Sequence, residues 1–191
     1  MQANENIKNN SITHILNKVT TNRLFWIITF SFLTVAGAQV AIPVQPVPFT
    51  LQTMMVVLAG AFLGSKNGAY SQLLYLFLGS TGLPVFANGA AGIAYLFGPT
   101  GGYLLAFPLG AYLTGYIIEK NKNYVFVTLA MFAGEALVII CGTLFLNVFF
   151  IRDFSEALKV GGILFSLATV IKVFAAVSIY FGVTKSYKKL P

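Results

Sequence analysis

The chain has 191 residues, of which 57% are hydrophobic and 9% are charged, and its formal net charge is +7. A soluble domain carries about 25% charged residues, so this chain has too few charges to cover a water-facing surface. Uncharged apolar segments recur along its length, which indicates an all-α integral membrane protein with a single membrane domain over residues 1–191.

Two residue types that often carry chemistry are each present once. Cys141 lies in an apolar run and has no second cysteine with which to form an intrachain disulfide. His14 precedes the first apolar run, and a single histidine cannot form a histidine metal site or an intramembrane proton relay. We therefore expect neither a metal nor a cofactor.

Residues 1–23 are polar and are expected to form a cytoplasmic segment. The apolar run behind them is not followed by a small-residue cleavage site, which favours a retained signal anchor over a cleaved signal peptide. A bundle of six transmembrane helices is expected over about 24–183, followed by a cytoplasmic tail at 184–191. The expected spans are 24–42, 49–64, 68–79, 102–118, 124–150 and 161–183.

The distribution of lysine and arginine predicts the orientation of these spans. Two cations, Arg152 and Lys159, fall on one side of the membrane, and Lys172 lies within the last span. Nine fall on the other side, and by the positive-inside rule this side, with both termini, is cytoplasmic. The nine are Lys8, Lys18, Arg23, Lys66, Lys120, Lys122, Lys185, Lys188 and Lys189. The outer connections are then 43–48, 80–101 and 151–160, which suggests capture of a ligand from outside.

The stretch AIPVQPVPFTLQT, residues 41–53, joins the first two spans. Its prolines restrict the loop, which predicts a preorganised lid over a cavity. Phe49 would be an apolar cap, and Thr50 and Gln52 would direct polar atoms into the bundle. An alternative role for Thr50 is the N-cap of the second span.

The next outer connection is rich in glycine. Its alternatives are a set of turns between two spans, or a re-entrant segment whose bare backbone approaches a ligand. In the second case Asn88 and Gly89 would contact the ligand, because the amide of Asn88 offers both donors and an acceptor. Tyr95 and Tyr103 flank the segment with broad, partly polar rings.

Two charges, Glu135 and Lys172, lie inside apolar runs. Ionisable residues at such positions are costly and are candidates for function. One alternative is a structural ion pair between neighbouring helices. However, side chains lean toward the N-terminus of their own helix, which directs Lys172 outward and Glu135 toward the cytoplasm. We therefore favour Lys172 as a ligand contact and Glu135 as a weaker one.

Several motifs are absent from the sequence. The chain contains no G-x-x-x-x-G-K-[ST] stretch, no H-E-x-x-H and no nucleophile elbow. The chain is therefore expected to be a binding protein without its own ATPase rather than an enzyme. A stand-alone, ion-coupled carrier for a small, mostly apolar organic acid, with Glu135 as its proton site, is the alternative.

Three stretches, IPVQPVPFTLQT, GAYSQLLYLFLGSTGLPVFANGAAG and LFGPTGGYLLAFPLGAYLTGY, closely resemble the BioY family of biotin-specific S components of energy-coupling factor (ECF) transporters. The resemblance implies a six-helix bundle in the bacterial cytoplasmic membrane that captures biotin from outside. It also implies a coupling module of a transmembrane T protein and two ATPases. The sequence departs from the family at Thr169, where an Asp usually precedes the Lys by three residues.

The resemblance adds a role to two further groups of residues. Biotin has a ureido ring, an apolar middle and a carboxylate tail, and Lys172 is expected to pair with that carboxylate. Small residues in the first span are expected to dock on the T protein, because they let helices approach closely; these are Thr34, Gly37, Ala38 and Ala41. Packing within the bundle is the alternative for these four.

Overall fold

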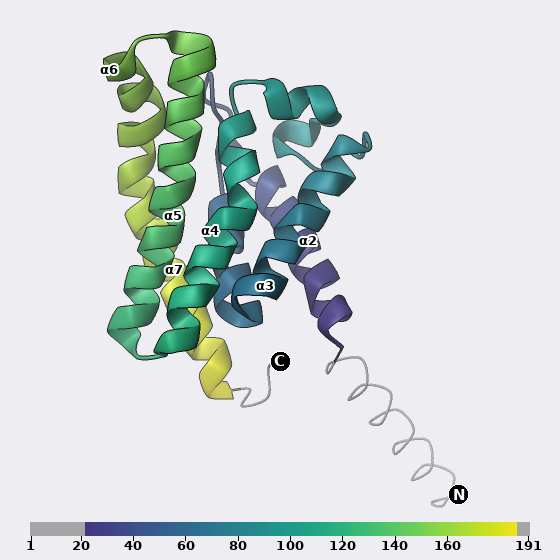
Figure 1. Cartoon of the computed structure of the whole chain (residues 1–191), viewed down its shortest axis with the longest axis vertical. Helices are drawn as coiled ribbons and strands as arrows, with labels where there is room; N and C mark the ends of the chain where they lie inside the picture. Colours follow the sequence, from purple (N-terminus) through teal and green to yellow (C-terminus); the bar gives the residue numbers. More distant parts are fainter. Residues whose placement is uncertain (1–21, 187–191) are drawn as a thin grey trace, which may run out of the picture.

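The computed structural model describes residues 22–186. Five long helices dominate this part of the chain and stand roughly side by side (Figure 1). They are α2 (Arg23–Gln39), α3 (Gln52–Ser80), α4 (Gly101–Lys120), α5 (Tyr124–Leu146) and α7 (Leu164–Ser186). The expected all-helical bundle is therefore confirmed, whereas the count of six spans is not.

The first connection differs from the expectation. The first helix begins behind its N-cap Asn22, whose side chain accepts a hydrogen bond from the backbone N–H of Leu24 at 2.9 Å, and it ends at Gln39. Ala41–Ile42 form a short strand, β1, because a following proline disfavours helical backbone. This strand pairs with β2 (Phe49–Thr50) in an antiparallel hairpin.

The third helix replaces two expected spans. It is assigned as one element but is broken at Gly64, where φ is 77° and ψ is 179°. Its two halves lie against each other, since a Cβ on Gly68 would be only 2.8 Å from the Cα of Gly60. Eight residues of straight helix span about 12 Å, so α3 bends back sharply at Gly64.

The break in α3 is stabilised from the end of α4. A carboxylate oxygen of Glu119 accepts hydrogen bonds from the backbone N–H of Ser65 at 2.7 Å and from its hydroxyl at 3.0 Å. This N–H begins the second half of the helix, where unpaired donors and the helix dipole favour a negative charge. Glu119 therefore acts as a cap supplied by a different helix.

Glycines allow α3, α4 and α5 to approach closely. A Cβ on Gly60 would lie 2.2 Å from the carbonyl oxygen of Ala111 in α4, and one on Gly134 would lie 2.1 Å from the hydroxyl of Thr114. Small residues of this kind are typical of helix packing in membranes. They position α4 between its two neighbours, and this arrangement forms the centre of the bundle (Figure 1).

Short helical segments join α5 to α7, and the chain reverses direction between them at Arg152 and Asp153. A π-helical segment, η3 (Asn147–Ile151), extends α5 and ends at Arg152, whose φ is 56°. The chain then enters α6 (Phe154–Ala157) behind its N-cap Asp153 and passes through η4 (Leu158–Ile163) into α7. The long connection between α3 and α4 holds two short 3₁₀ helices, η1 (Ala87–Gly89) and η2 (Ile93–Phe97).

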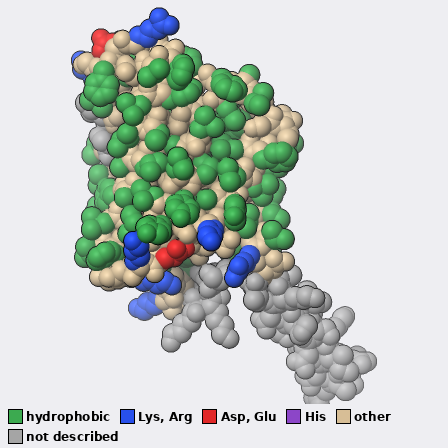
Figure 2. Space-filling model, viewed as in Figure 1, with side chains coloured by type: hydrophobic (Ala, Val, Ile, Leu, Met, Phe, Trp, Pro, Cys, Tyr) green, Lys and Arg blue, Asp and Glu red, His purple; other side chains and the backbone are tan. Residues whose placement is uncertain are grey.

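The surface fits a lipid environment. Hydrophobic side chains form a broad band between two ends that carry the lysines and arginines (Figure 2). Three helical segments in the described part are long and apolar enough to cross a membrane, namely Gly101–Lys120, Tyr124–Ile151 and Phe154–Ser186. The large side chains of Phe32, Phe77 and Ile171 are each more than half exposed, which water would disfavour by about 1.5–3 kcal/mol per side chain.

The connections between helices lie at the two ends of the molecule, in the two groups that the sequence predicts. The start of α2, the bend in α3, the α4–α5 connection and the end of α7 lie at one end of the molecule (Figure 1). The hairpin loop, η1, η2 and α6 lie at the other. Residues 1–21 and 187–191, and with them the expected cytoplasmic segments and four of the counted lysines, lie outside the described residues. Which end faces the cytoplasm stays a prediction.

Candidate ligand-binding site

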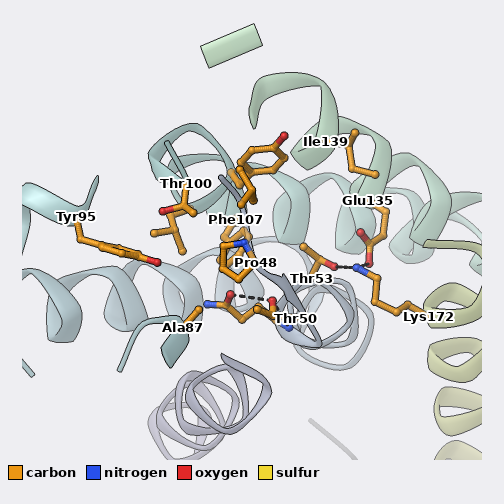
Figure 3. A pocket seen from close by; sticks show the side chains of 14 residues that line it. Pro48, Thr50, Thr53, Ala87, Tyr95, Thr100, Phe107, Glu135, Ile139 and Lys172 are labelled. Atoms are coloured by element: carbon orange, nitrogen blue, oxygen red, sulfur yellow. Dashed lines mark hydrogen bonds and ion pairs between the residues drawn. The ribbon is translucent and has the colours of Figure 1, made fainter. Parts of the chain in front are cut away.

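A pocket opens where the hairpin, the long connection and four helices (α3, α4, α5 and α7) meet, with about 480 Å³ of space between its walls including its mouth. Its described lining is Val47, Pro48, Thr50, Gln52, Thr53, Ala87, Tyr95, Thr100, Tyr103, Leu104, Phe107, Glu135, Ile139 and Lys172. Most of these side chains are shown and labelled in Figure 3.

One end of the pocket carries a buried charge pair. The Nζ atom of Lys172 lies 3.7 Å from Oε1 of Glu135, and the two side chains are 4% and 0% exposed. Lys172 also donates a hydrogen bond to the hydroxyl of Thr53 on α3 (Figure 3). The expectation that the two charged side chains diverge is therefore wrong. An unpaired buried charge costs several kcal/mol, which outweighs a weak directional tendency of helical side chains.

Two positions discussed in the sequence, Phe49 and Thr169, do not line the pocket. The Nζ atom of Lys172 lies 5.3 Å from the ring centroid of Phe49, a cation–π geometry. Phe49 therefore lies beside the ammonium rather than among the residues that line the pocket. Thr169 is buried on α7 and also lies outside the lining, so the negative partner of Lys172 comes from α5 instead.

A hydrogen-bond network fixes the start of α3. The hydroxyl of Thr50 donates to Oε1 of Gln52 at 2.9 Å and accepts from the Gln52 backbone N–H at 3.3 Å. The amide of Gln52 donates to the hydroxyl of Tyr75 at 2.5 Å, and that hydroxyl donates to the carbonyl of Val85 at 3.2 Å. Thr50 thus bonds the backbone at the helix start, but the N-cap position belongs to Leu51, so the alternative role of Thr50 as the N-cap is wrong.

Tyr95 and Phe107 line the pocket, and Phe86 and Tyr75 pack against their rings without lining it. Tyr95 stacks on Phe86 with ring centroids 5.3 Å apart, and Phe86 meets the edge of Tyr75 at 5.6 Å. Phe107 stacks on Tyr75 with ring centroids 6.2 Å apart. Phe86 reaches this position because Gly79 has no side chain; a Cβ there would lie 2.0 Å from the Phe86 ring.

Tyr103 lines the same region from the first turn of α4. Its hydroxyl donates to the carbonyl of Gly161 at 3.2 Å and lies 3.3 Å from the hydroxyl of Thr143. These contacts join α4 to α5 and to η4. The ring is therefore held in place by the bundle where it lines the pocket.

Asn88 and Gly89 lie outside the pocket. Both have left-handed backbone, with φ of 58° and 72°. Asn88 lines a second, more open depression between the hairpin loop and the long connection, which shares Pro48, Tyr95 and Thr100 with the pocket. This depression forms a vestibule at the pocket's mouth. Gly89 lines neither space among the described residues.

The structure adds residues that the sequence analysis missed. Thr53 and Thr100 bring hydroxyl groups to the pocket, and Phe107 and Ile139 bring apolar walls. Thr53 carried a usable signal, since it directly follows Gln52 at a helix start. Phe107 and Ile139 lie within apolar runs, where nothing in the pattern separates a pocket residue from a lipid-facing one.

The four small residues of the first span do not form an exposed surface. Thr34 and Ala38 are fully buried, and the hydroxyl of Thr34 lies 3.3 Å from the amide oxygen of Gln72 in α3. Gly37 is buried against α3, and Ala41 is half-buried in β1. This is the alternative of packing within the bundle. Docking through α2 would have to use the opposite side of the helix.

The sequence is similar to those of known transport proteins. The family model described as "BioY family" matches residues 8–189. The biotin transporter BioY of Thermotoga maritima is 41% identical over 147 residues, which cover 77% of this chain and 86% of the relative. The probable biotin transporter BioY of Pyrococcus horikoshii is 38% identical over 150 residues, covering 78% and 88%.

A solved structure agrees with the fold. The crystal structure of the S-component for biotin from an ECF-type ABC transporter superimposes with a TM-score of 0.80 at 27% sequence identity. The match covers 85% of this chain and 90% of the other. Together with the apolar helices, these comparisons make the chain a multi-pass membrane protein and a transporter subunit rather than an enzyme.

Proposed function

The chain belongs to the BioY family, and from this premise we propose that it is the biotin-binding S component of an ECF transporter in the bacterial cytoplasmic membrane. It would capture biotin from outside and pass it inward with a T protein and two ATPases. The observation that carries the proposal is a pocket with aromatic walls and a buried Glu135–Lys172 pair at one end.

The chemistry of the pocket suits biotin. Tyr95, Tyr103 and Phe107 offer ring faces to the apolar thiophane and valeryl groups. Gln52, Thr50 and the charged end add donors and acceptors for the polar groups of the ligand. We propose that biotin lies along this pocket and that Asn88 contacts it during entry through the vestibule.

The topology that we propose has six spans with both termini in the cytoplasm. The two halves of α3, divided at Gly64, count as separate spans in this proposal. Two observations support it. The halves fold back on each other, and Arg23, Lys66, Lys120, Lys122 and Lys185 all belong to segments at the end where the described chain begins and finishes. The positive-inside rule makes this end cytoplasmic.

Binding and coupling need separate experiments. Titration of the purified protein in detergent with biotin should give saturable, one-to-one binding in the absence of ATP. Reconstitution with a T protein and two ATPases should then give ATP-dependent uptake into vesicles. Accumulation by the chain alone, driven by an ion gradient, would favour the ion-coupled carrier instead. Absence of biotin binding would refute the proposal.

A further inference from the structure

The pocket has a second polar end, opposite the charge pair, at the start of α4. Thr100 precedes the first residue of this helix and lines both the pocket and the vestibule. The residue is 8% exposed, and its hydroxyl has no hydrogen-bond partner among the described residues. A buried hydroxyl without a partner costs roughly 1–3 kcal/mol. A hydrogen bond from this hydroxyl to a bound ligand would remove that cost.

The hydroxyl is not used to cap its own helix. Thr100 is the N-cap of α4 but makes no side-chain capping bond. The helix start is instead satisfied by backbone, with the N–H groups of Tyr103 and Leu104 both donating to the Thr100 carbonyl at 3.1 and 3.2 Å. The Thr100 side chain is therefore available to a bound molecule without loss of the helix end.

The surroundings of Thr100 favour a negative group. The positive end of the α4 dipole lies here, and the labelled Tyr95 directs its hydroxyl into the same side of the pocket (Figure 3). Among the described lining residues, Glu135 alone carries a negative charge, and it lies at the other end beside Lys172. An anionic group at Thr100 therefore meets donors and no carboxylate.

The charged end is less suited to an anion than its lysine suggests. Glu135 already neutralises Lys172 at 3.7 Å, so a ligand carboxylate placed there would be close to a second carboxylate. The pair presents one acceptor and one donor side by side. This arrangement is complementary to a neutral group with both N–H donors and a carbonyl.

We propose that Thr100, at the N-terminus of α4, is the subsite for the carboxylate of the ligand, with Tyr95 beside it. The inference rests on the proposed function, since it assigns the orientation of biotin in the pocket. The carboxylate lies at the vestibule and the ureido ring lies toward Glu135 and Lys172. This orientation replaces the expected pairing of Lys172 with the carboxylate.

The test compares biotin with biotin amide, which lacks the negative charge, in binding titrations on the purified chain. Thr100→Val removes the hydroxyl at nearly constant volume, and Thr100→Ser retains it as the matched control. Thr100→Val should weaken biotin binding about tenfold to a hundredfold, the range for a hydrogen bond to a charged group. It should hardly change binding of the amide, and Thr100→Ser should bind both ligands like the wild type.

The variant Lys172→Met tests the same orientation of biotin separately, so the test does not depend on whether the Thr100 variants fold. It should weaken biotin and the amide by equal factors and leave the preference for biotin intact. Loss of that preference in Lys172→Met would overturn the inference, as would unchanged biotin binding by Thr100→Val or equal losses for both ligands. A wild-type protein that binds neither ligand would refute the proposed function itself.

Discussion

Lys172 of α7 and Glu135 of α5 form an ion pair inside the bundle, with 3.7 Å between Nζ and Oε1. The two carboxylate oxygens of Glu135 have no hydrogen-bond partner among the described residues. The carboxylate therefore depends on Lys172 for compensation of its charge. This mutual dependence makes the pair a sensitive point in the ligand-free protein.

Removal of one member of the pair should destabilise the protein more than removal of both. We expect Glu135→Gln to lower the free energy of unfolding by about 3–5 kcal/mol, because it leaves a buried ammonium without a counter-charge. The double variant Glu135→Gln with Lys172→Met should recover part of this loss. Thermal unfolding in detergent, arranged as a double-mutant cycle, measures the difference. A double variant less stable than either single variant would contradict the pairing.

The contact between Gly79 and Phe86 should control the aromatic wall. Gly79→Ala places a methyl group 2.0 Å from the Phe86 ring, and such overpacking typically costs about 1–3 kcal/mol. The displaced ring would no longer support Tyr95, so biotin binding should weaken about tenfold. The matched control is Gly182→Ala in α7, where a Cβ meets no atom within 4 Å. Equal effects of the two substitutions on binding would show that Phe86 does not position the wall.

The carboxylate of Glu119 should stabilise the break in α3. Glu119→Gln keeps the shape of the side chain but removes the charge at the start of the second half-helix, and we expect a loss of about 1 kcal/mol in unfolding free energy. Glu156→Gln serves as the control, because Glu156 is exposed at the start of α6. High salt should reduce this loss of unfolding free energy less than it would for an ion pair on the surface. The reason is that Oε1 of Glu119 lies only 2.7 Å from the Ser65 backbone nitrogen, well within the screening length.

Bulky substitutions at the small residues of α2 should destabilise the isolated protein itself, whether or not a T protein is present. A Cβ on Gly37 would lie 3.0 Å from Met55 Cγ and 3.1 Å from the carbonyl oxygen of Leu51. Gly37→Leu should therefore lower the melting temperature of the isolated protein and weaken biotin binding. Phe32→Leu, at a position 59% exposed on the same helix, should change neither. An isolated Gly37→Leu protein with normal stability and binding, but without assembly on a T protein, would restore the original docking hypothesis.

The proposed orientation predicts which connections are accessible from outside. In a Cys141→Ala background, Lys159→Cys should react with a membrane-impermeant maleimide in whole cells, and Lys122→Cys should react only after permeabilisation. Both positions are exposed and belong to opposite ends of the molecule in Figure 1. The reverse pattern would invert the topology.

Much of the pocket was predictable from residue chemistry. Thr50, Gln52, Tyr95, Tyr103, Glu135 and Lys172 were candidates in the sequence, and all six line the pocket. Each is a polar or charged residue next to or within an apolar run, where its presence needs a reason. Whether these six contact the ligand stays a prediction.

Other features could not be predicted because they depend on tertiary contacts. The meeting of Glu135 and Lys172 depends on how α5 and α7 pack, which local side-chain direction does not specify. Burial of Thr34 and Gly37 depends on which side of α2 faces α3, since small residues suit either a partner or the bundle. The sequence predicts that the helical region divides near Gly64, between the spans 49–64 and 68–79. It does not predict that the two halves pack directly on each other at Gly60 and Gly68.

The walls of the pocket are separated widely along the chain, from Val47 in the hairpin to Lys172 in the last helix. During synthesis, the pocket is thus complete only when α7 has joined the helices made before it and has brought Lys172 to the lining. If the proposed function holds, biotin bound in the finished pocket would hold the early and late segments together, and it would add stability of about 2.7 kcal/mol at a free concentration one hundred times Kd. Ligand binding would consequently report that all the helices have assembled. A chain that stops before Lys172 lacks part of the pocket and should not retain the ligand.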